Sequence, residues 1–148
     1  MRFGWKALVA APVLALIATA AVAGDAENGE KVFKKCKACH KIGEGAVNGT
    51  GPLLNHVIGR TAGTAEGFSY SADMVAAGAA GLVWTEETIA AYIEDPTAYL
   101  KEATGDSGAK SKMTFKLKKD SDREDVAAYV ATFSDPAEAA EGSEESSD

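Results

Sequence analysis

Cys36, Cys39 and His40 form the pattern C-x-x-C-H, the part of this sequence best suited to chemistry. Two thiols at this spacing can add to the two vinyl groups of one haem, and the His that follows can place an imidazole nitrogen under the iron. A thioredoxin-like redox pair or a zinc site also uses C-x-x-C, but neither needs His directly after the second Cys. The chain has only two cysteines, so no second pair can complete four zinc ligands. The pattern therefore predicts one covalently attached haem c, provided that an export signal and a second axial ligand are present.

Residues 1–23 have the features of a secretory signal peptide. They begin with a basic region, continue with an apolar stretch over 7–20 and end with small residues at 21–23. A retained membrane anchor is the alternative, but this stretch is interrupted by Pro12 and is shorter than the roughly 20 residues that a spanning helix needs. We therefore expect cleavage after Ala23, export to the periplasm and no direct membrane insertion of the mature chain.

Charge is distributed unevenly along the chain. Of 15 basic and 22 acidic residues, two basic ones, Arg2 and Lys6, lie in the signal, and six acidic ones lie in 135–148, which has no basic residue. The remaining segment, 24–134, has 13 basic and 16 acidic residues and a net charge of −3. We expect 24–134 to be a single domain and 135–148, rich in acidic residues, Ala and Ser, to be a disordered tail. An acidic, exported chain does not suggest a nucleic-acid partner.

The patterns within 24–134 predict an all-α fold of four or five short helices joined by Gly-rich loops. The predicted helices cover 25–37, 71–77, 85–95, 96–100 and a last stretch from 121 to a point before Pro136. The predicted N-caps are Asp25, Ser71, Thr85 and a Ser121–Glu124 capping box. Gly78 is expected to end the second helix. Gly29, four residues before Phe33, could allow another helix to approach closely, although a neutral surface glycine is as good an interpretation.

The loops predict that the haem organises the domain. Residues 42–60 contain five glycines and no long apolar periodicity, and 102–112 are polar. Long irregular segments in a domain of this size pack poorly alone. We therefore expect the chain to be largely unfolded without haem.

Three residues could supply the second axial ligand. Met74 lies at helical spacing and reads as a core or gap-filling side chain. His56 follows closely on Gly51-Pro52, a turn whose Pro52 carbonyl could accept the outer N–H of His40, so His56 would lie on the proximal side. Met113 lies in a loop far enough along the chain to reach the other face, and His/Met coordination raises the reduction potential. Met113 is therefore the predicted ligand; a core Met113 with His/His or open coordination, and a plain turn at Pro52, are the alternatives.

With these residues in place the chain resembles class I cytochrome c, and within it the bacterial cytochrome c2 group related to mitochondrial cytochrome c. The resemblance covers about residues 24–133. It rests on Gly29, Phe33, the C-x-x-C-H pentapeptide, Gly51-Pro52, Gly59-Arg60, Gly67-Phe68-Ser69-Tyr70, Trp84-Thr85-Glu86-Glu87, Tyr92, Lys112-Met113-Thr114-Phe115 and the stretch from Glu124 to Tyr129.

The resemblance implies roles around the haem. Arg60, Tyr70, Trp84 and Ser111 match positions that bind or neutralise the haem propionates, which need donors when buried. Tyr92 matches a tyrosine near the methionine ligand, and Phe115 matches an aromatic residue beside the haem edge. The chain departs from the usual family residues at Leu53, His56 and Met74, which affects the expected potential and not the fold.

Lysines adjoin both predicted axial ligands. Neither 31–41 nor 110–119 contains an acidic residue, and together they hold ten of the 13 basic residues of the mature chain. A positive patch there would steer acidic partners and weaken with salt, whereas the alternative is an ordinary solvated lysine face. The predicted docking residues are Lys34, Lys35, Lys37, Lys110, Lys112, Lys116, Lys118 and Phe115.

These features predict a periplasmic, monomeric one-electron carrier and not an enzyme. The resemblance implies a cytochrome bc1 complex as donor and a terminal oxidase, reductase or photosynthetic reaction centre as acceptor. One alternative is a ligand-binding or peroxidase-like haem protein whose Met113 dissociates. Another is the same haem domain tethered by an uncleaved N-terminus.

Overall fold

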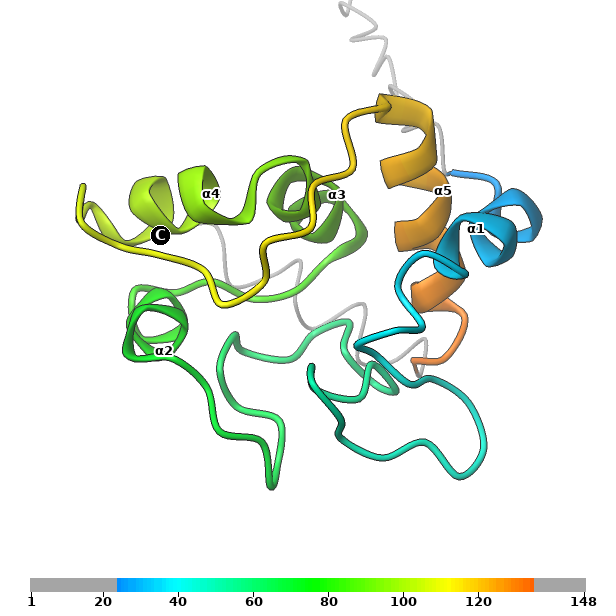
Figure 1. The fold of residues 1–148 in the computed structure, drawn as a ribbon, viewed down its shortest axis with the longest axis horizontal. Coiled ribbons are helices and arrows are strands. Elements are labelled where there is room, and N and C mark those ends of the chain that lie inside the picture. Colours follow the sequence, from blue (N-terminus) through cyan, green and yellow to red (C-terminus); the bar gives the residue numbers. More distant parts are fainter. Residues whose placement is uncertain (1–23, 135–148) are drawn as a thin grey trace, which may run out of the picture.

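A computed structural model describes residues 24–134 and shows five α-helices there (Figure 1). The helices are α1 (Ala26–Phe33), α2 (Ala72–Ala79), α3 (Glu86–Glu94), α4 (Pro96–Thr104) and α5 (Asp120–Ala131). The predicted signal peptide, 1–23, and the predicted acidic tail, 135–148, lie outside the described residues. Within 24–134 the extended pairing is limited to an isolated bridge between Thr61 and Val83, so the predicted all-α class is confirmed. No helix of this part of the chain is long and apolar enough to cross a membrane.

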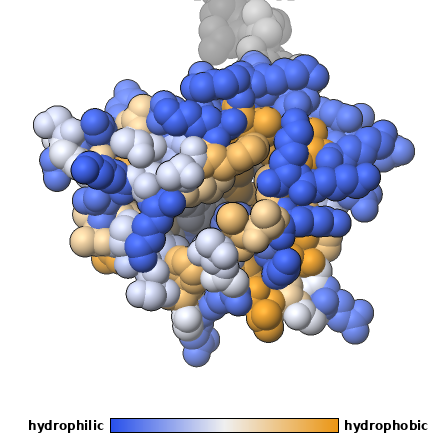
Figure 2. All heavy atoms as spheres, in the orientation of Figure 1, coloured by the Kyte–Doolittle hydropathy of each residue, from blue (hydrophilic) through white to orange (hydrophobic). Residues whose placement is uncertain are grey.

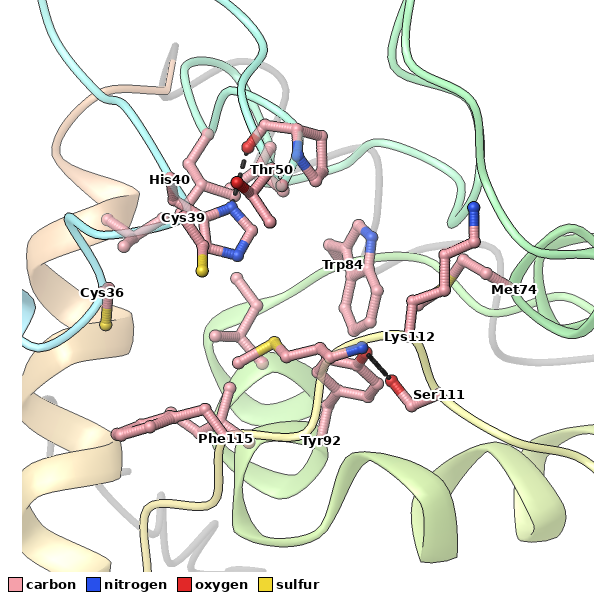
Figure 3. A pocket seen from close by; sticks show the side chains of 18 of the residues that line it. Cys36, Cys39, His40, Thr50, Met74, Trp84, Tyr92, Ser111, Lys112 and Phe115 are labelled. Atoms are coloured by element: carbon pink, nitrogen blue, oxygen red, sulfur yellow. Dashed lines mark hydrogen bonds between the residues drawn. The ribbon is translucent and has the colours of Figure 1, made fainter.

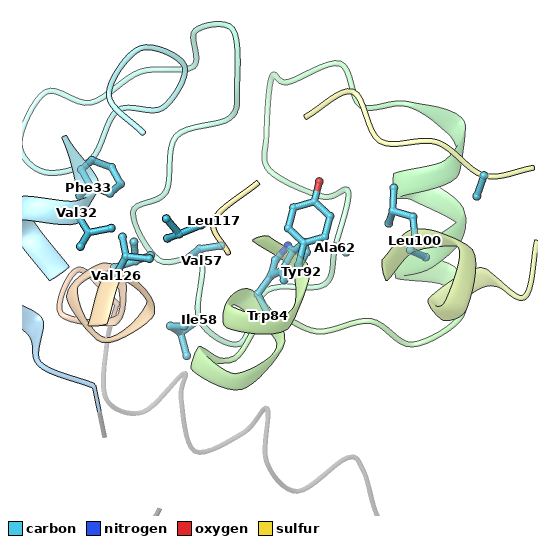
Figure 4. Close-up of a cluster of buried hydrophobic side chains, with 13 residues drawn as sticks. Val32, Phe33, Val57, Ile58, Ala62, Trp84, Tyr92, Leu100, Leu117 and Val126 are labelled. Atoms are coloured by element: carbon cyan, nitrogen blue, oxygen red, sulfur yellow. The ribbon is translucent and has the colours of Figure 1, made fainter. Parts of the chain in front are cut away.

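The first and last helices pack against each other (Figure 1). Gly29 makes this possible, because a Cβ atom at that position would collide with the carbonyl oxygen of Asp125. Phe33 stacks obliquely on Tyr129, with ring centroids 5.4 Å apart. The close-approach interpretation of Gly29 is therefore confirmed, and Val32, Phe33 and Val126 form the core between the two helices (Figure 4).

The start of α1 is as predicted, but its end is not. The Asp25 carboxylate accepts the backbone N–H groups of Glu27 and Asn28, which confirms the N-cap. The helix ends at Phe33 and not near Lys37. Beyond it the chain continues in tighter turns, in which the N–H of Cys36 donates to the Phe33 carbonyl at 2.8 Å. The C-x-x-C-H pentapeptide therefore follows α1 and is not part of it.

In α2, the predicted cap is present but the predicted stop is not. The Ser71 hydroxyl accepts the Met74 N–H at 3.2 Å. Gly78 lies inside the helix and is buried, and a Cβ atom there would collide with the Ala62 carbonyl. Its missing side chain therefore serves packing and not helix termination.

Capping interactions define where α3 and α4 begin. Thr85 and Thr88 form a capping box at the start of α3, which confirms the Thr85 cap. Asp95 follows the end of α3 and caps α4 by accepting the Ala98 N–H at 3.1 Å. Pro96 begins α4 as predicted, but the helix extends to Thr104, past Leu100, and ends at Gly105 with a φ of 69°.

The predicted capping box of the last helix is wrong. The N-cap of α5 is Lys119, which makes no side-chain capping hydrogen bond, and neither Ser121 nor Glu124 acts as a cap. The helix begins earlier because the N–H of Arg123 donates to the Lys119 carbonyl. Asp120 and Asp122 in its first turn interact favourably with the helix dipole instead.

Residues 105–119, which we term the strap, connect α4 to α5. In Figure 1 the strap runs back along α4 and α3 before it reaches α5. Met113 is half-buried in it, whereas Leu117 is buried in the core. Trp84, Tyr92 and Leu100 continue that core toward α3 and α4 (Figure 4).

Candidate haem site

A cavity of about 350 Å³ lies between the loops after α1, helix α3, helix α5 and the strap. Figure 2 shows it as a hollow with apolar residues inside and hydrophilic residues around it. Every predicted attachment, axial and propionate-side residue lines this cavity: Cys36, Cys39, His40, Pro52, Arg60, Tyr70, Trp84, Tyr92, Ser111 and Met113. Residues separated by up to 77 positions in the chain are therefore brought to one place.

His40 is held on one wall of the cavity. Its Nδ1 lies 2.8 Å from the Pro52 carbonyl oxygen, and because a carbonyl can only accept, Nδ1 must carry the proton (Figure 3). That tautomer leaves the lone pair of Nε2 available for a metal. Burial lowers the pKa of His40 below its usual value, although the hydrogen bond to Pro52 opposes this effect. The imidazole is thus neutral, as an iron ligand must be.

The two cysteines are both free thiols on the same side of the cavity (Figure 3). Burial raises the pKa of the Cys36 thiol to about 11, despite the opposing charge of Lys35. A thiol with such a pKa is protonated at neutral pH, which is the opposite of the low-pKa thiolate of a thioredoxin-like redox centre. The pKa of Cys36 therefore does not match that of a thioredoxin-like redox thiol.

Met113 is positioned by polar contacts of the strap. Its N–H donates to the Ser111 hydroxyl at 3.1 Å, and the Tyr92 hydroxyl lies 2.8 Å from the same oxygen. The N–H of Ser111 donates to Thr97 of α4 at 3.1 Å. Burial raises the pKa of Tyr92, so its hydroxyl stays protonated at neutral pH. Ser111 therefore anchors the strap beside Met113, a role that the sequence did not indicate.

The other residues predicted to face the haem propionates line the cavity and have hydrogen-bond or packing partners of their own. Arg60 directs its guanidinium toward the carbonyl oxygens of Leu53 and Asn55, each at 3.4 Å. The Tyr70 hydroxyl accepts the Ala65 N–H at 3.2 Å. Trp84 is 8% exposed and packs edge-on against Tyr92, with ring centroids 5.1 Å apart. Their propionate roles remain predictions.

The two rejected ligand candidates differ in position. Met74 lines the cavity and packs against the core, in keeping with its interpretation as a gap-filling side chain. His56 is exposed, does not line the cavity and has a φ of 57°. Among residues 24–134, His40 is therefore the only histidine that lines the cavity, and no second histidine there could take the place of Met113 as ligand.

The predicted docking lysines are all exposed, but only two of them line the cavity. Lys35 and Lys112 stand at its rim, where Phe115 is 38% exposed; the others, Lys34, Lys37, Lys110, Lys116 and Lys118, lie outside the lining. Lys116 pairs with Asp95 at 2.6 Å, so part of its charge is neutralised by an acidic residue distant in sequence. The surface formed by the lysine-rich segments 31–41 and 110–119 is therefore less uniformly positive than their sequences alone suggest.

Some lining residues were expected only as helix faces. Ile89 and Ile93 of α3 and Val126 and Val130 of α5 line the cavity, although their spacing indicates only an apolar stripe. Thr50 also lines it, and no pattern in the sequence singles it out (Figure 3). Hydrophobic periodicity shows that a face is covered without showing what covers it.

The Cytochrome c family model matches residues 26–134. The chain belongs to the cytochrome c family. It is 54% identical over 132 residues to "Cytochrome c2" of Rhodobacter capsulatus, covering 84% of this chain and 95% of that protein. It is 53% identical over 117 residues to "Cytochrome c2 iso-1" of Rhodospirillum centenum, covering 75% of this chain and 98% of that protein. The solved structure of cytochrome c2 from Rhodospirillum centenum matches with a TM-score of 0.73 at 49% identity, over 76% of this chain and all of that one.

These similarities place the chain in the c2 group of class I c-type cytochromes, with one covalently attached haem c. The residues present fit that group: two free thiols on one side of an apolar cavity, a neutral imidazole with Nε2 free, and a thioether lining the same space. Gly51 supports the fit, because a Cβ atom there would lie 2.5 Å from Cε1 of His40. The cytochrome therefore functions in electron transfer and not as an enzyme.

Proposed function

We propose that this cytochrome is a periplasmic one-electron shuttle whose haem is attached through Cys36 and Cys39 and ligated by His40 and Met113. The observation that carries the proposal is that His40, with Nδ1 bound to the Pro52 carbonyl, and Met113 line the same cavity. When bound, haem c supplies a single iron that exchanges one electron without bond making or breaking in a substrate.

The protein's part on the proximal side is to orient one nitrogen. Pro52 accepts the Nδ1 proton, and Gly51 allows the loop to pass directly over the ring. This support makes His40 a better donor and limits rotation of its ring. Cys36 and Cys39 tether the cofactor next to it.

On the distal side, the protein supplies a soft, uncharged ligand. Ser111, Tyr92 and Thr97 hold the strap so that Met113 remains in the cavity. A thioether favours the ferrous state, which raises the reduction potential. If haem is bound, His40 and Met113 would hold its iron and keep small molecules from it, and the apolar lining would exclude water.

Electrons are exchanged at the exposed rim. Phe115, Lys35 and Lys112 surround the mouth of the cavity, and the exposed lysines around it attract acidic partner surfaces. Donor and acceptor of matching chemistry are a cytochrome bc1 complex and a terminal oxidase, reductase or photosynthetic reaction centre. The relatives named cytochrome c2 from Rhodospirillum centenum and Rhodobacter capsulatus support electron exchange with redox partners.

The proposal includes export to the periplasm, which the pattern of residues 1–23 supports. Residues 1–23 carry a cleavable secretory signal pattern, so the mature protein begins at Gly24 in the periplasm. Domain 24–134 carries the haem, and the acidic segment 135–148 follows it. The N-terminal mass of the mature protein tests cleavage directly.

An optical and redox titration of wild type and Met113→Ala tests the ligand assignment. We expect Met113→Ala to lose the absorption band of thioether bound to ferric iron, to lower the potential and to bind carbon monoxide in the ferrous state. Met74→Leu is the matched control, since Met74 lines the same cavity, and it should retain the band. A Met113→Ala protein with an unchanged band and potential would refute the assignment.

A further inference from the structure

Arg123 is the one charged residue buried within 24–134, with 8% of its surface exposed. Arg123 lies in the first turns of α5, and formation of the helix does not require its side chain to be buried. A buried guanidinium is costly unless its donors are paired, so its partners indicate what it is held for.

The partners of Arg123 belong to the strap, to α3 and to α5. One guanidinium nitrogen, Nη1, donates to the carbonyl oxygens of Leu117 at 3.2 Å and Lys118 at 2.7 Å. The other, Nη2, pairs with Asp120 at 2.6 Å and lies 3.6 Å from a Glu94 carboxylate oxygen. Arg123 thus fastens the end of the strap to two helices.

The strap has few other attachments after Met113. The N–H of Leu117 donates to the Ile93 carbonyl at 2.8 Å. Between Met113 and Leu117, the backbone groups of 114–116 make no hydrogen bond to other described residues. The path of the chain beyond Met113 is therefore set by where Leu117 and Lys118 are held, together with the exposed ion pair of Lys116 with Asp95.

We propose that Arg123 is a positioning residue for Met113: by binding the Leu117 and Lys118 carbonyls it keeps the strap closed and the thioether on the iron. This inference rests on the proposed function, in which Met113 is the distal ligand. Ser111 fixes the strap before Met113, and Arg123 fixes it after Met113, so the ligand is held from both sides.

Arginine suits this task better than lysine. Its planar guanidinium can serve two carbonyls and two carboxylates at once, whereas an ammonium is a flexible point charge. Loss of the guanidinium would leave the two strap carbonyls without these donors. About one net hydrogen bond corresponds to roughly a tenfold shift in the equilibrium between the closed and the open strap.

Ferric holoprotein with Arg123→Lys and Arg123→Met, titrated with imidazole as an external ligand, tests the inference. Because imidazole binds only when Met113 has left the iron, we expect it to bind about tenfold more tightly to Arg123→Lys than to wild type. Asp125→Asn is the matched control on the same helix, because the hydrogen bonds of Asp125 go to Asp25 and Asn28, and toward the strap it has only a charge interaction with Lys119. We expect it to lower the stability of the fold without changing imidazole affinity.

Hydrogen exchange of the Leu117 amide provides a second measurement if Arg123→Met does not fold. In Arg123→Lys this amide should exchange about tenfold faster, while amides in the middle of α5 exchange as in wild type. Unchanged exchange at Leu117 contradicts the inference.

Two outcomes separate failure of this inference from failure of the proposed ligand. If Met113→Ala abolishes the thioether band but Arg123→Lys and Asp125→Asn bind imidazole equally tightly, Arg123 only stabilises the fold and the inference is overturned. If Met113→Ala leaves both the band and the imidazole affinity unchanged, Met113 is not the ligand, and the proposed function and this inference fail together.

Discussion

Gly51 lies against the imidazole ring of His40 so closely that no side chain fits between them. A Cβ atom at Gly51 would lie 2.5 Å from Cε1 and 2.8 Å from both ring nitrogens. The same loop presents the Pro52 carbonyl to Nδ1. The contact and the hydrogen bond together fix the ring from its face and from its edge.

We expect Gly51→Ala to displace this ring or the loop that covers it. Overpacking of this kind costs about 1–3 kcal/mol of unfolding free energy, measurable by denaturant titration of the holoprotein. The ferric spectrum should change as well, because the proximal nitrogen moves. Gly49→Ala is the control, since a Cβ there would meet its nearest neighbour, the Cys39 carbonyl, at an ordinary 3.5 Å. Equal stability of the two variants would show that the loop adapts.

The contact between α1 and α5 should make stability depend on acidic pH. The Asn28 amide and then the Asp25 N–H donate to the Asp125 carboxylate, at 2.6 and 2.7 Å, and they hold the pKa of Asp125 below its usual value. A lowered pKa in the folded state stabilises the fold above the unfolded-state pKa, and this contribution is lost as pH falls through the folded-state pKa.

Asp125→Asn tests that dependence. At pH 7 we expect it to lower the unfolding free energy by about 1 kcal/mol, and the difference from wild type should shrink below about pH 4. Glu124→Gln, one residue earlier and exposed, should show neither effect. A difference that is constant from pH 7 to pH 3 would contradict the assignment of the effect to the Asp125 charge.

The lysines at the rim should accelerate reaction with anions. At low ionic strength we expect Lys35→Glu and Lys112→Glu each to slow reduction of hexacyanoferrate(III) several-fold, and salt should reduce the difference. Lys101→Glu on α4 changes the net charge equally but lies outside the cavity lining. The same slowing in Lys101→Glu would mean that net charge, and not the rim, determines the rate.

Haem-free protein should not fold. Without haem, the apolar lining of the cavity of about 350 Å³ would face water, and the loops around it would lose their main packing partner. Cys36→Ala/Cys39→Ala protein that has not acquired haem should therefore show no cooperative thermal transition by circular dichroism. A sharp transition would show that the helices pack without the cofactor.

Residue type and spacing were enough to predict the features that depend on neighbouring residues. The C-x-x-C-H spacing, the Asp25, Ser71 and Thr85 caps and the Pro96 helix start involve groups within a few positions of one another. Such short-range geometry is set by backbone dihedrals and side-chain length, so residue type and spacing suffice to predict it.

The contacts between segments far apart in the chain became visible only in the folded structure. The ion pair of Lys116 with Asp95 and the hydrogen bonds of Asp125 with α1 join residues far apart in the chain. At Gly78 and at the start of α5, local patterns failed because packing against Ala62 and the position of Arg123 outweighed them. Cap and turn preferences are worth about 1 kcal/mol each, so burial and long-range hydrogen bonds override them, and their partners cannot be read from spacing alone.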